Sequence, residues 1–275
     1  MSDHTWTTVV DGLAFPECPR WHDGTLWFTD VAAGEVLRLD PASGSAEVVC
    51  RVEGHPAGIG FLPDGRLLVA VGTTRQLLRQ EADGALVVHA DLSDLATGML
   101  NDMHVDAQGR AYVGNYGDES VPPAPPFPAV LALVGPDGSV SAAAEGMRFA
   151  NGVHLTPDGR TLVVAETRAT PGCLTTFDVA DDGSLSHRRT LVEFEPGVMP
   201  DGIAMAPDAS VWVASPFTGA VLHVSAAGEV VETVEVAHPY AVALGGDGEV
   251  YACSAPTWEP GPALELRGGS VLRLT

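Results

Sequence analysis

The stretch Thr156-Pro157-Asp158-Gly159-Arg160-Thr161-Leu162-Val163 has the pattern of a tight turn that leads into an apolar strand. A turn of the Asp-Gly kind between short apolar segments is typical of a β-hairpin. The same pattern occurs five more times, at residues 21–28, 62–69, 106–113, 206–213 and 245–252. The turn glycines, or the residues in their place, stand at 24, 65, 109, 159, 209 and 248, so they are 41, 44, 50, 50 and 39 residues apart.

A period of this length, built from about four short strands, is typical of β-propeller blades. The last apolar segment, Val271–Leu274, is the third strand of the sixth repeat, and its outer partner must come from the N-terminus near Thr7–Val10. Such closure removes an exposed sheet edge. We therefore predict an all-β fold, a six-bladed β-propeller with blades of four antiparallel strands, formed by one domain over residues 1–275 and closed by the N-terminal strand. The proline-rich segment 120–128 is predicted to be a rigid loop insertion.

Charge and composition limit the function. The chain has 36 acidic and 14 basic residues, a net charge of −22, and every basic residue is Arg. Such a field repels phosphate backbones and anionic membranes, so neither nucleic acid nor membrane is expected as a partner. The lack of Lys excludes Walker-A and Schiff-base chemistry. No apolar run is long enough to span a membrane, the first residues do not form a signal peptide, and the four Cys are scattered. We expect a cytoplasmic protein that acts on a small molecule.

Six residues at equivalent positions of the repeats are expected to face the propeller axis. Stepping eight residues back from each turn, or seven in the first repeat, reaches an axial column that comprises Glu17, Ala57, Asn101, Asn151, Asp201 and Tyr240. Four of these six are short oxygen-bearing side chains, and two of the three Asn in the chain are among them. Carboxylate and amide oxygens of this kind suit a hard divalent cation. The alternative is that they only cap strands through turns with the following Gly.

Four motifs resemble the gluconolactonase / regucalcin (senescence marker protein) / luciferin-regenerating enzyme family. They are Phe15-Pro16-Glu17-Cys18-Pro19-Arg20-Trp21, Asn101-Asp102-Met103-His104-Val105-Asp106, Asn151-Gly152-Val153 with Pro157–Leu162, and Pro200-Asp201-Gly202-Ile203. The resemblance implies a six-bladed propeller with one divalent metal, often calcium, in its channel. It places metal ligands at Glu17, Asn151 and Asp201, a metal or substrate contact at Asn101, and the base for lactone hydrolysis at Asp201.

Two positions depart from the family pattern. Met99 stands where sugar-lactone members carry a substrate-binding Arg, and Cys18 stands where a Gly usually follows the Glu. Met99 favours a more apolar lactone or ester over an aldonolactone. Asn115, Tyr116 and Tyr240 are further candidates for substrate contact, the first two at the channel mouth and the third as a pocket wall.

These residues, together with the family resemblance, predict a divalent-metal-dependent hydrolase that opens a lactone or related cyclic ester. The metal, Ca²⁺ in the favoured reading with Mg²⁺, Mn²⁺ or Zn²⁺ as alternatives, would polarise the carbonyl and acidify water, and Asp201 would take the proton of that water. One alternative keeps the fold and metal but changes the reaction to that of a lyase, isomerase or cyclase. Another is a non-catalytic calcium-binding propeller.

Overall fold

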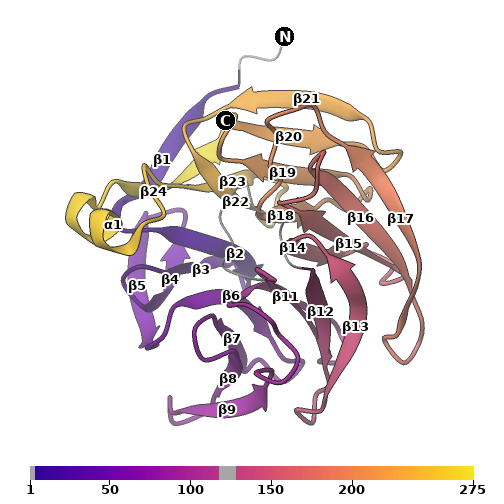
Figure 1. Cartoon of the computed structure of the whole chain (residues 1–275). Helices are drawn as coiled ribbons and strands as arrows, with labels where there is room; N and C mark the ends of the chain where they lie inside the picture. Colours follow the sequence, from indigo (N-terminus) through magenta and orange to yellow (C-terminus); the bar gives the residue numbers. More distant parts are fainter. Residues whose placement is uncertain (1–3, 118–127) are drawn as a thin grey trace. The chain divides into compact units, whose positions relative to one another are not determined.

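The computed structural model describes residues 4–117 and 128–275, and shows six four-stranded antiparallel sheets (Figure 1). This confirms the predicted six-bladed β-propeller. Most of the proline-rich segment 120–128 lies outside the described residues. The contacts group the chain into a first unit, residues 1–56 with 201–275, and a second unit, residues 57–200. The single-domain assignment stays a prediction, and each unit is described by itself.

The first unit contains three sheets. Their strands, in spatial order, are β1 (Trp6–Leu13), β24 (Gly269–Leu274), β23 (Val250–Ser254) and β22 (Pro239–Leu244); β2 (Pro16–His22), β3 (Thr25–Asp30), β4 (Glu35–Asp40) and β5 (Ser45–Arg51); and β18 (Ile203–Met205), β19 (Val211–Ser215), β20 (Ala220–Val224) and β21 (Val230–Glu235). The N-terminal strand β1 pairs with the C-terminal strand β24, with Thr8 opposite Leu272. The predicted closure by the N-terminal strand is therefore confirmed.

The second unit contains the other three sheets. Their strands are β6 (Pro56–Phe61), β7 (Leu67–Val71), β8 (Gln76–Gln80) and β9 (Leu86–Asp91); β10 (Leu100–Val105), β11 (Ala111–Asn115), β12 (Ala129–Val134) and β13 (Val140–Met147); and β14 (Ala150–Leu155), β15 (Thr161–Glu166), β16 (Cys173–Val179) and β17 (Leu185–Glu193). Here the inner strands β6 and β10 lie so close together that only a glycine fits at position 58. A Cβ at Gly58 would lie 2.5 Å from the backbone nitrogen of Met103.

The repeated turn has the conformation that its sequence predicts. The glycines at 24, 65, 109, 159 and 248 all have positive φ, between 69° and 86°. In the fifth repeat Ala209 takes this place with a φ of 64°, in the left-handed region that disfavours residues with a Cβ. The polar turn partners keep this conformation in place, since Asp208 accepts a 3.0 Å hydrogen bond from the backbone nitrogen of Ser210.

The hydrophobic cores lie between the faces of neighbouring sheets. In the first unit Leu26 and Phe28 of β3 pack with Tyr251 and Cys253 of β23, all of them buried. In the second unit Tyr112, Leu131 and Val164 belong to one such cluster. Alternating side chains on both faces of each sheet explain why most inner strands read as nearly continuous apolar runs.

The sequence did not predict α1 (Pro260–Leu266), the helix that lies between β23 and β24. A proline in its first turn favours the helical start, and Arg267 ends it in the left-handed conformation with a φ of 43°. Only Ala263 of this helix is buried. Within residues 4–117 and 128–275, no helix is long and apolar enough to cross a membrane.

Candidate functional site

Three members of the axial column lie in the first unit, at corresponding ends of inner strands. Glu17 is on β2, Asp201 directly precedes β18, and Tyr240 is on β22. The backbone nitrogen of Gly202 donates a 2.9 Å hydrogen bond to the carbonyl oxygen of Tyr240. The segment that carries Asp201 therefore lies directly beside the segment that carries Tyr240.

The pKa of the Tyr240 phenol depends on its burial and on nearby charges. Burial raises the pKa of its phenol first, and the carboxylates of Asp201 and Glu17 raise it further, to about 12. Both carboxylates thus act on one buried phenol. Two carboxylates that act on the same buried group also repel each other, and a bound cation would relieve that repulsion.

The loop before Glu17 is held by Asp30, a residue that the sequence reasoning did not single out. Asp30 is fully buried at the end of β3, and its two carboxylate oxygens each accept a 2.8 Å hydrogen bond, from the backbone nitrogens of Ala14 and Phe15. The backbone nitrogen of Cys18 donates a 3.1 Å hydrogen bond to the carboxylate of Glu17. The orientation of Glu17 is therefore supported from both sides along the chain.

Cys18 occupies a position that suits glycine. Its φ is 48°, and the pairing of β2 with β3 shifts register between Glu17 and Arg20. A bulge of this kind redirects side chains at the end of a strand. The family glycine at this position thus has a conformational reason, and Cys18 accepts the same conformation at some cost in strain.

The second unit carries Asn101 on β10 and Asn151 on β14. Each stands at an irregularity, because β10 shifts register between Leu100 and Met103 and β14 between Ala150 and Val153. Asn151 is buried, with 5% of its surface exposed, and Asn101 is partly buried. The two strands are neighbours, since the rings of His104 and His154 lie 4.3 Å apart between them.

A threonine connects the second-unit loops with the residue before Asp201. Thr167 is buried, and its hydroxyl donates a 2.7 Å hydrogen bond to the carbonyl oxygen of Pro200. Its backbone nitrogen bonds the carbonyl oxygen of Phe149, two residues before Asn151, at 3.2 Å. Nothing in the sequence distinguishes this threonine from the others, and only the structure shows its place.

The predicted substrate contacts of the second unit differ in their surroundings. Met99 is partly buried, and its carbonyl oxygen accepts a 3.0 Å hydrogen bond from the backbone nitrogen of Tyr116. The ring of Tyr116 packs on Phe149 at 4.2 Å. Asn115 is fully buried, and its amide bonds the carbonyl oxygen of Val130 and the nitrogen of Gly117. Asn115 thus anchors a loop, and its contact with substrate stays a prediction.

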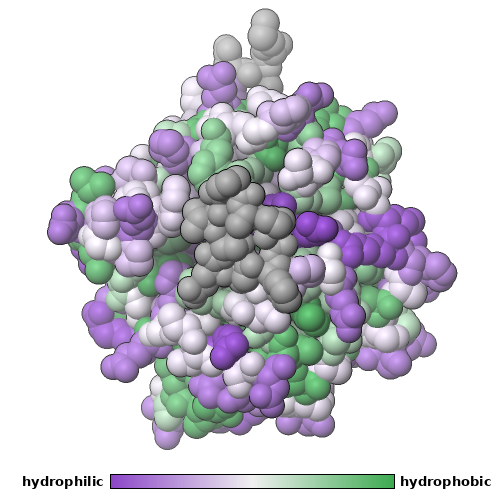
Figure 2. All heavy atoms as spheres, in the orientation of Figure 1, coloured by the Kyte–Doolittle hydropathy of each residue, from purple (hydrophilic) through white to green (hydrophobic). Residues whose placement is uncertain are grey.

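A pocket of about 1020 Å³ lies in the second unit between the loops after β15 and β17. Figure 2 shows a strongly hydrophilic band in the region of β16 and β17. Glu166 lines this pocket. Its carboxylate accepts 2.7 Å hydrogen bonds from the guanidinium of Arg188 and from the backbone nitrogen of Arg148, so it stabilises the loops around it. Positive and negative side chains balance here, so this pocket shows no preference for one sign of charge.

The chemistry of the predicted donor set is compatible with a cation. Among the described residues, no group of three or more His, Cys, Asp or Glu side chains could hold a metal ion. The predicted set differs in kind, because it combines the carboxylates of Glu17 and Asp201 with amide oxygens of Asn151 and Asn101. These are hard oxygen ligands, which Ca²⁺ accepts together with water. Because the carboxylates lie in the first unit and the amides in the second, their convergence stays a prediction.

The six four-stranded antiparallel sheets define the class of protein, the six-bladed β-propellers. A protein-family description, SMP-30/Gluconolactonase/LRE-like region, matches residues 15–255. The chain belongs to this family.

Named relatives support the same family. A 6-deoxy-6-sulfogluconolactonase of Pseudomonas putida is 28% identical over 242 residues, which covers 84% of this chain and 79% of that protein. A luciferin-regenerating enzyme has a similar structure, with a TM-score of 0.84, 22% identity, and coverage of 99% of this chain and 95% of that one. A calcium-binding protein, regucalcin, of Agrobacterium tumefaciens has a TM-score of 0.80 at 21% identity, with 97% and 91% coverage.

Proposed function

We propose that the protein is a divalent-metal-dependent hydrolase that opens a lactone or a related cyclic ester. The observation that carries the proposal is that β2, which carries Glu17, and β18, which Asp201 directly precedes, both contact β22, which carries the buried Tyr240. Family membership supports it, as does the relative named for lactonase activity.

Glu17, Asn151 and Asp201 are the residues that would hold the metal, with Asn101 beside them. Ca²⁺ is the favoured ion, because all four donors are oxygens and a structural relative is described as a calcium-binding protein. When bound, the ion supplies Lewis-acid polarisation of the carbonyl and lowers the pKa of water.

The chain's own residues perform the remaining work. Asp201 takes a proton from the attacking water with one carboxylate oxygen, for which its place before β18 is held by the 2.9 Å bond between its nitrogen and the carbonyl of Ala214. Tyr240 stays neutral at ordinary pH, since its pKa is about 12, and forms an aromatic wall with Phe15 at 4.9 Å. Both rings are buried, and an aromatic wall beside the carboxylates would exclude water and strengthen their interaction with a cation.

A panel of metal-reconstituted assays tests the proposal. Metal-free protein is combined with Ca²⁺, Mg²⁺, Mn²⁺ or Zn²⁺ and assayed against aldonolactones, aliphatic lactones and aryl esters, with product analysis by mass. We expect hydrolysis that a chelator abolishes and one ion restores. Products without added water would favour a lyase, isomerase or cyclase, and tight metal uptake without turnover would favour a non-catalytic calcium-binding propeller.

The variant Asp201→Asn tests the proposed base. It keeps an oxygen donor but cannot take a proton, so at saturating metal we expect hydrolysis to fall at least 100-fold. Unchanged hydrolysis by a variant shown calorimetrically to hold metal would remove Asp201 from this role.

A further inference from the structure

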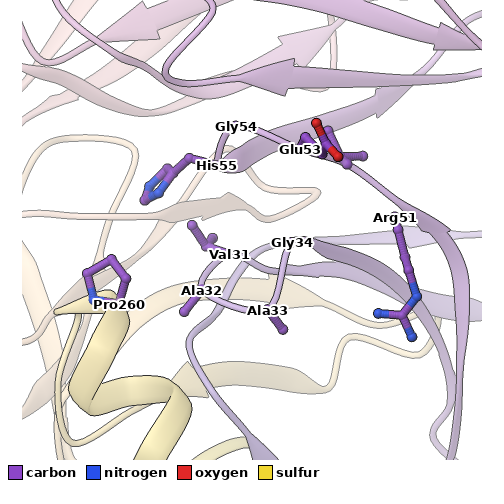
Figure 3. A pocket seen from close by; sticks show the side chains of 10 residues that line it. Val31, Ala32, Ala33, Gly34, Arg51, Glu53, Gly54, His55 and Pro260 are labelled. Carbon is purple, nitrogen blue, oxygen red and sulfur yellow. The ribbon is translucent and has the colours of Figure 1, made fainter.

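The first unit contains a pocket that the sequence did not predict. It has a volume of about 590 Å³, and its lining includes Val31, Ala32, Ala33, His55 and Pro260. Figure 3 shows His55 and Pro260 on one side, Val31 and Ala32 near them, and Arg51 on the opposite side. This volume lies within the range of sites that hold small organic ligands.

One lining residue of the pocket, Val31, also contacts residues near the candidate site. The backbone nitrogen of Val31 donates a 2.9 Å hydrogen bond to the carbonyl of Phe15, two residues before Glu17. Val31 and Phe15 belong to one buried cluster with Tyr240 and Ala255. Thus Val31 lines the pocket and also packs in the cluster that includes Tyr240.

The part of the lining formed by Val31, Ala32 and Ala33 is apolar, while Arg51 and Glu53 are the charged residues that line the pocket. Val31 has 5% of its surface exposed, and Ala32 and Ala33 pack against the same cluster. Burial lowers the pKa of His55, so its imidazole is neutral at pH 7. Arg51 is paired with Glu35, which satisfies the guanidinium at the far side. A charged group of a ligand placed beside Val31, Ala32 and Ala33 would therefore meet no side chain of opposite charge among them.

An exposed aromatic pair includes Trp258, which is close along the chain to the lining residue Pro260. Trp258 lies two residues before Pro260, which places it within about 7 Å along the chain. Its ring meets that of Phe217 edge to face at 5.9 Å, although the two residues remain 52% and 56% exposed. Phe217 follows β19, three residues after Ala214, which bonds the nitrogen of Asp201. Large exposed aromatic groups beside a pocket usually serve binding.

We propose that this pocket and its aromatic rim hold an apolar alkyl or aryl substituent of the substrate, while the ring to be opened lies at the column. The proposal rests on the proposed lactonase function and names its substrate class. Each methylene transferred from water to such a pocket strengthens binding about fourfold.

The test compares γ-butyrolactone with γ-nonalactone, which carries an added pentyl chain. We expect the wild-type kcat/KM to be at least 30-fold higher for γ-nonalactone. Ala32→Phe, which fills the pocket, should lower kcat/KM for γ-nonalactone at least tenfold and change that for γ-butyrolactone less than twofold. Ala42→Phe, in the exposed loop after β4, is the matched control and should change neither.

Trp258→Ala is a second variant, because the side chain is half exposed and its loss should not prevent folding. It should lower the preference for γ-nonalactone at least threefold. Calorimetric binding of unreactive 5-pentyl-2-pyrrolidinone and of 2-pyrrolidinone gives a readout that needs no turnover, with at least tenfold tighter binding expected for the pentyl compound.

The outcomes separate the two proposals. Selective binding of the pentyl lactam without any turnover would support the pocket and refute the lactonase function. Turnover without a preference for the pentyl chain would support the lactonase function and overturn the pocket. Equal binding of both lactams, or a change of oligomeric state in Trp258→Ala without a change in ligand preference, would also overturn the pocket assignment.

Discussion

Replacing Asp30 by asparagine should destabilise the protein strongly, although the two side chains have nearly the same shape. Asp30 is fully buried and accepts two 2.8 Å hydrogen bonds from backbone nitrogens, those of Ala14 and Phe15. Asparagine retains one acceptor oxygen and turns an NH₂ group toward the other nitrogen. One charge-assisted hydrogen bond is then lost, and two buried donors face each other.

The size of the effect follows from these two losses. A hydrogen bond to a charged group contributes about 1.5–3 kcal/mol, and a buried donor without a partner costs about 1–3 kcal/mol. Removing a buried charge offsets part of this, so we expect Asp30→Asn to lower the free energy of unfolding by about 2–4 kcal/mol. Because Phe15 lies two residues before Glu17, metal uptake should weaken as well.

Urea unfolding followed by circular dichroism measures the loss from the transition midpoint at constant slope. The control is Asp40→Asn in the same sheet, since Asp40 also accepts two hydrogen bonds, from the nitrogen of Ala42 and the hydroxyl of Ser43, but is exposed. Its loss should be clearly smaller. Equal midpoints for the two variants would refute the reasoning that burial makes the Asp30 contacts strong.

Three further predictions concern single residues: Thr167, Ala209 and Tyr112. Thr167→Val removes the hydroxyl that donates a hydrogen bond to the Pro200 carbonyl, so it should weaken metal binding at least fivefold in calorimetry. Thr167→Ser, which keeps the hydroxyl, should restore binding. The control Thr176→Val, which removes only a 3.5 Å contact, should bind metal as the wild type does. Ala209→Gly should raise stability by about 0.5–1 kcal/mol in urea unfolding, because φ at this residue is 64°, and a loss of stability would contradict this. Burial raises the pKa of Tyr112 to about 12, above its ordinary value near 10, so its contribution to stability is complete below pH 10 and is lost as pH rises through 12. The urea midpoint should therefore fall less steeply between pH 9 and 12.5 in Tyr112→Phe than in the wild type. An equal fall of the midpoint with pH in both proteins would disprove this prediction.

Local chemistry explains why the repeat was readable from the chain. Asp-Gly turns need positive φ, and the structure has it at Gly159 and at four other turn glycines. Apolar strands between such turns can only pair with their neighbours, so the number and order of sheets follow. The closing strand was predictable for the same reason, since the last strand lacked an outer partner.

The candidate site was only partly readable. Register reached six positions, with a slip of one residue in the first repeat, and oxygen-bearing side chains made four of them candidates: Glu17, Asn101, Asn151 and Asp201. It could not reveal Asp30, whose importance depends on two backbone nitrogens from another strand end. It also missed Thr167, because a threonine acquires its role only from the carbonyl that its hydroxyl reaches.

Turn chemistry and apolar patterning are local properties, so the order of residues sufficed to predict the six sheets that the structure shows. The pocket beside Val31 and the contact of Phe217 with Trp258 depended on folding, because they join residues far apart in the chain. Phe217 and Trp258 meet across 41 residues. No local preference encodes such a contact, since it forms only when packing brings separate loops to the same end of their sheets.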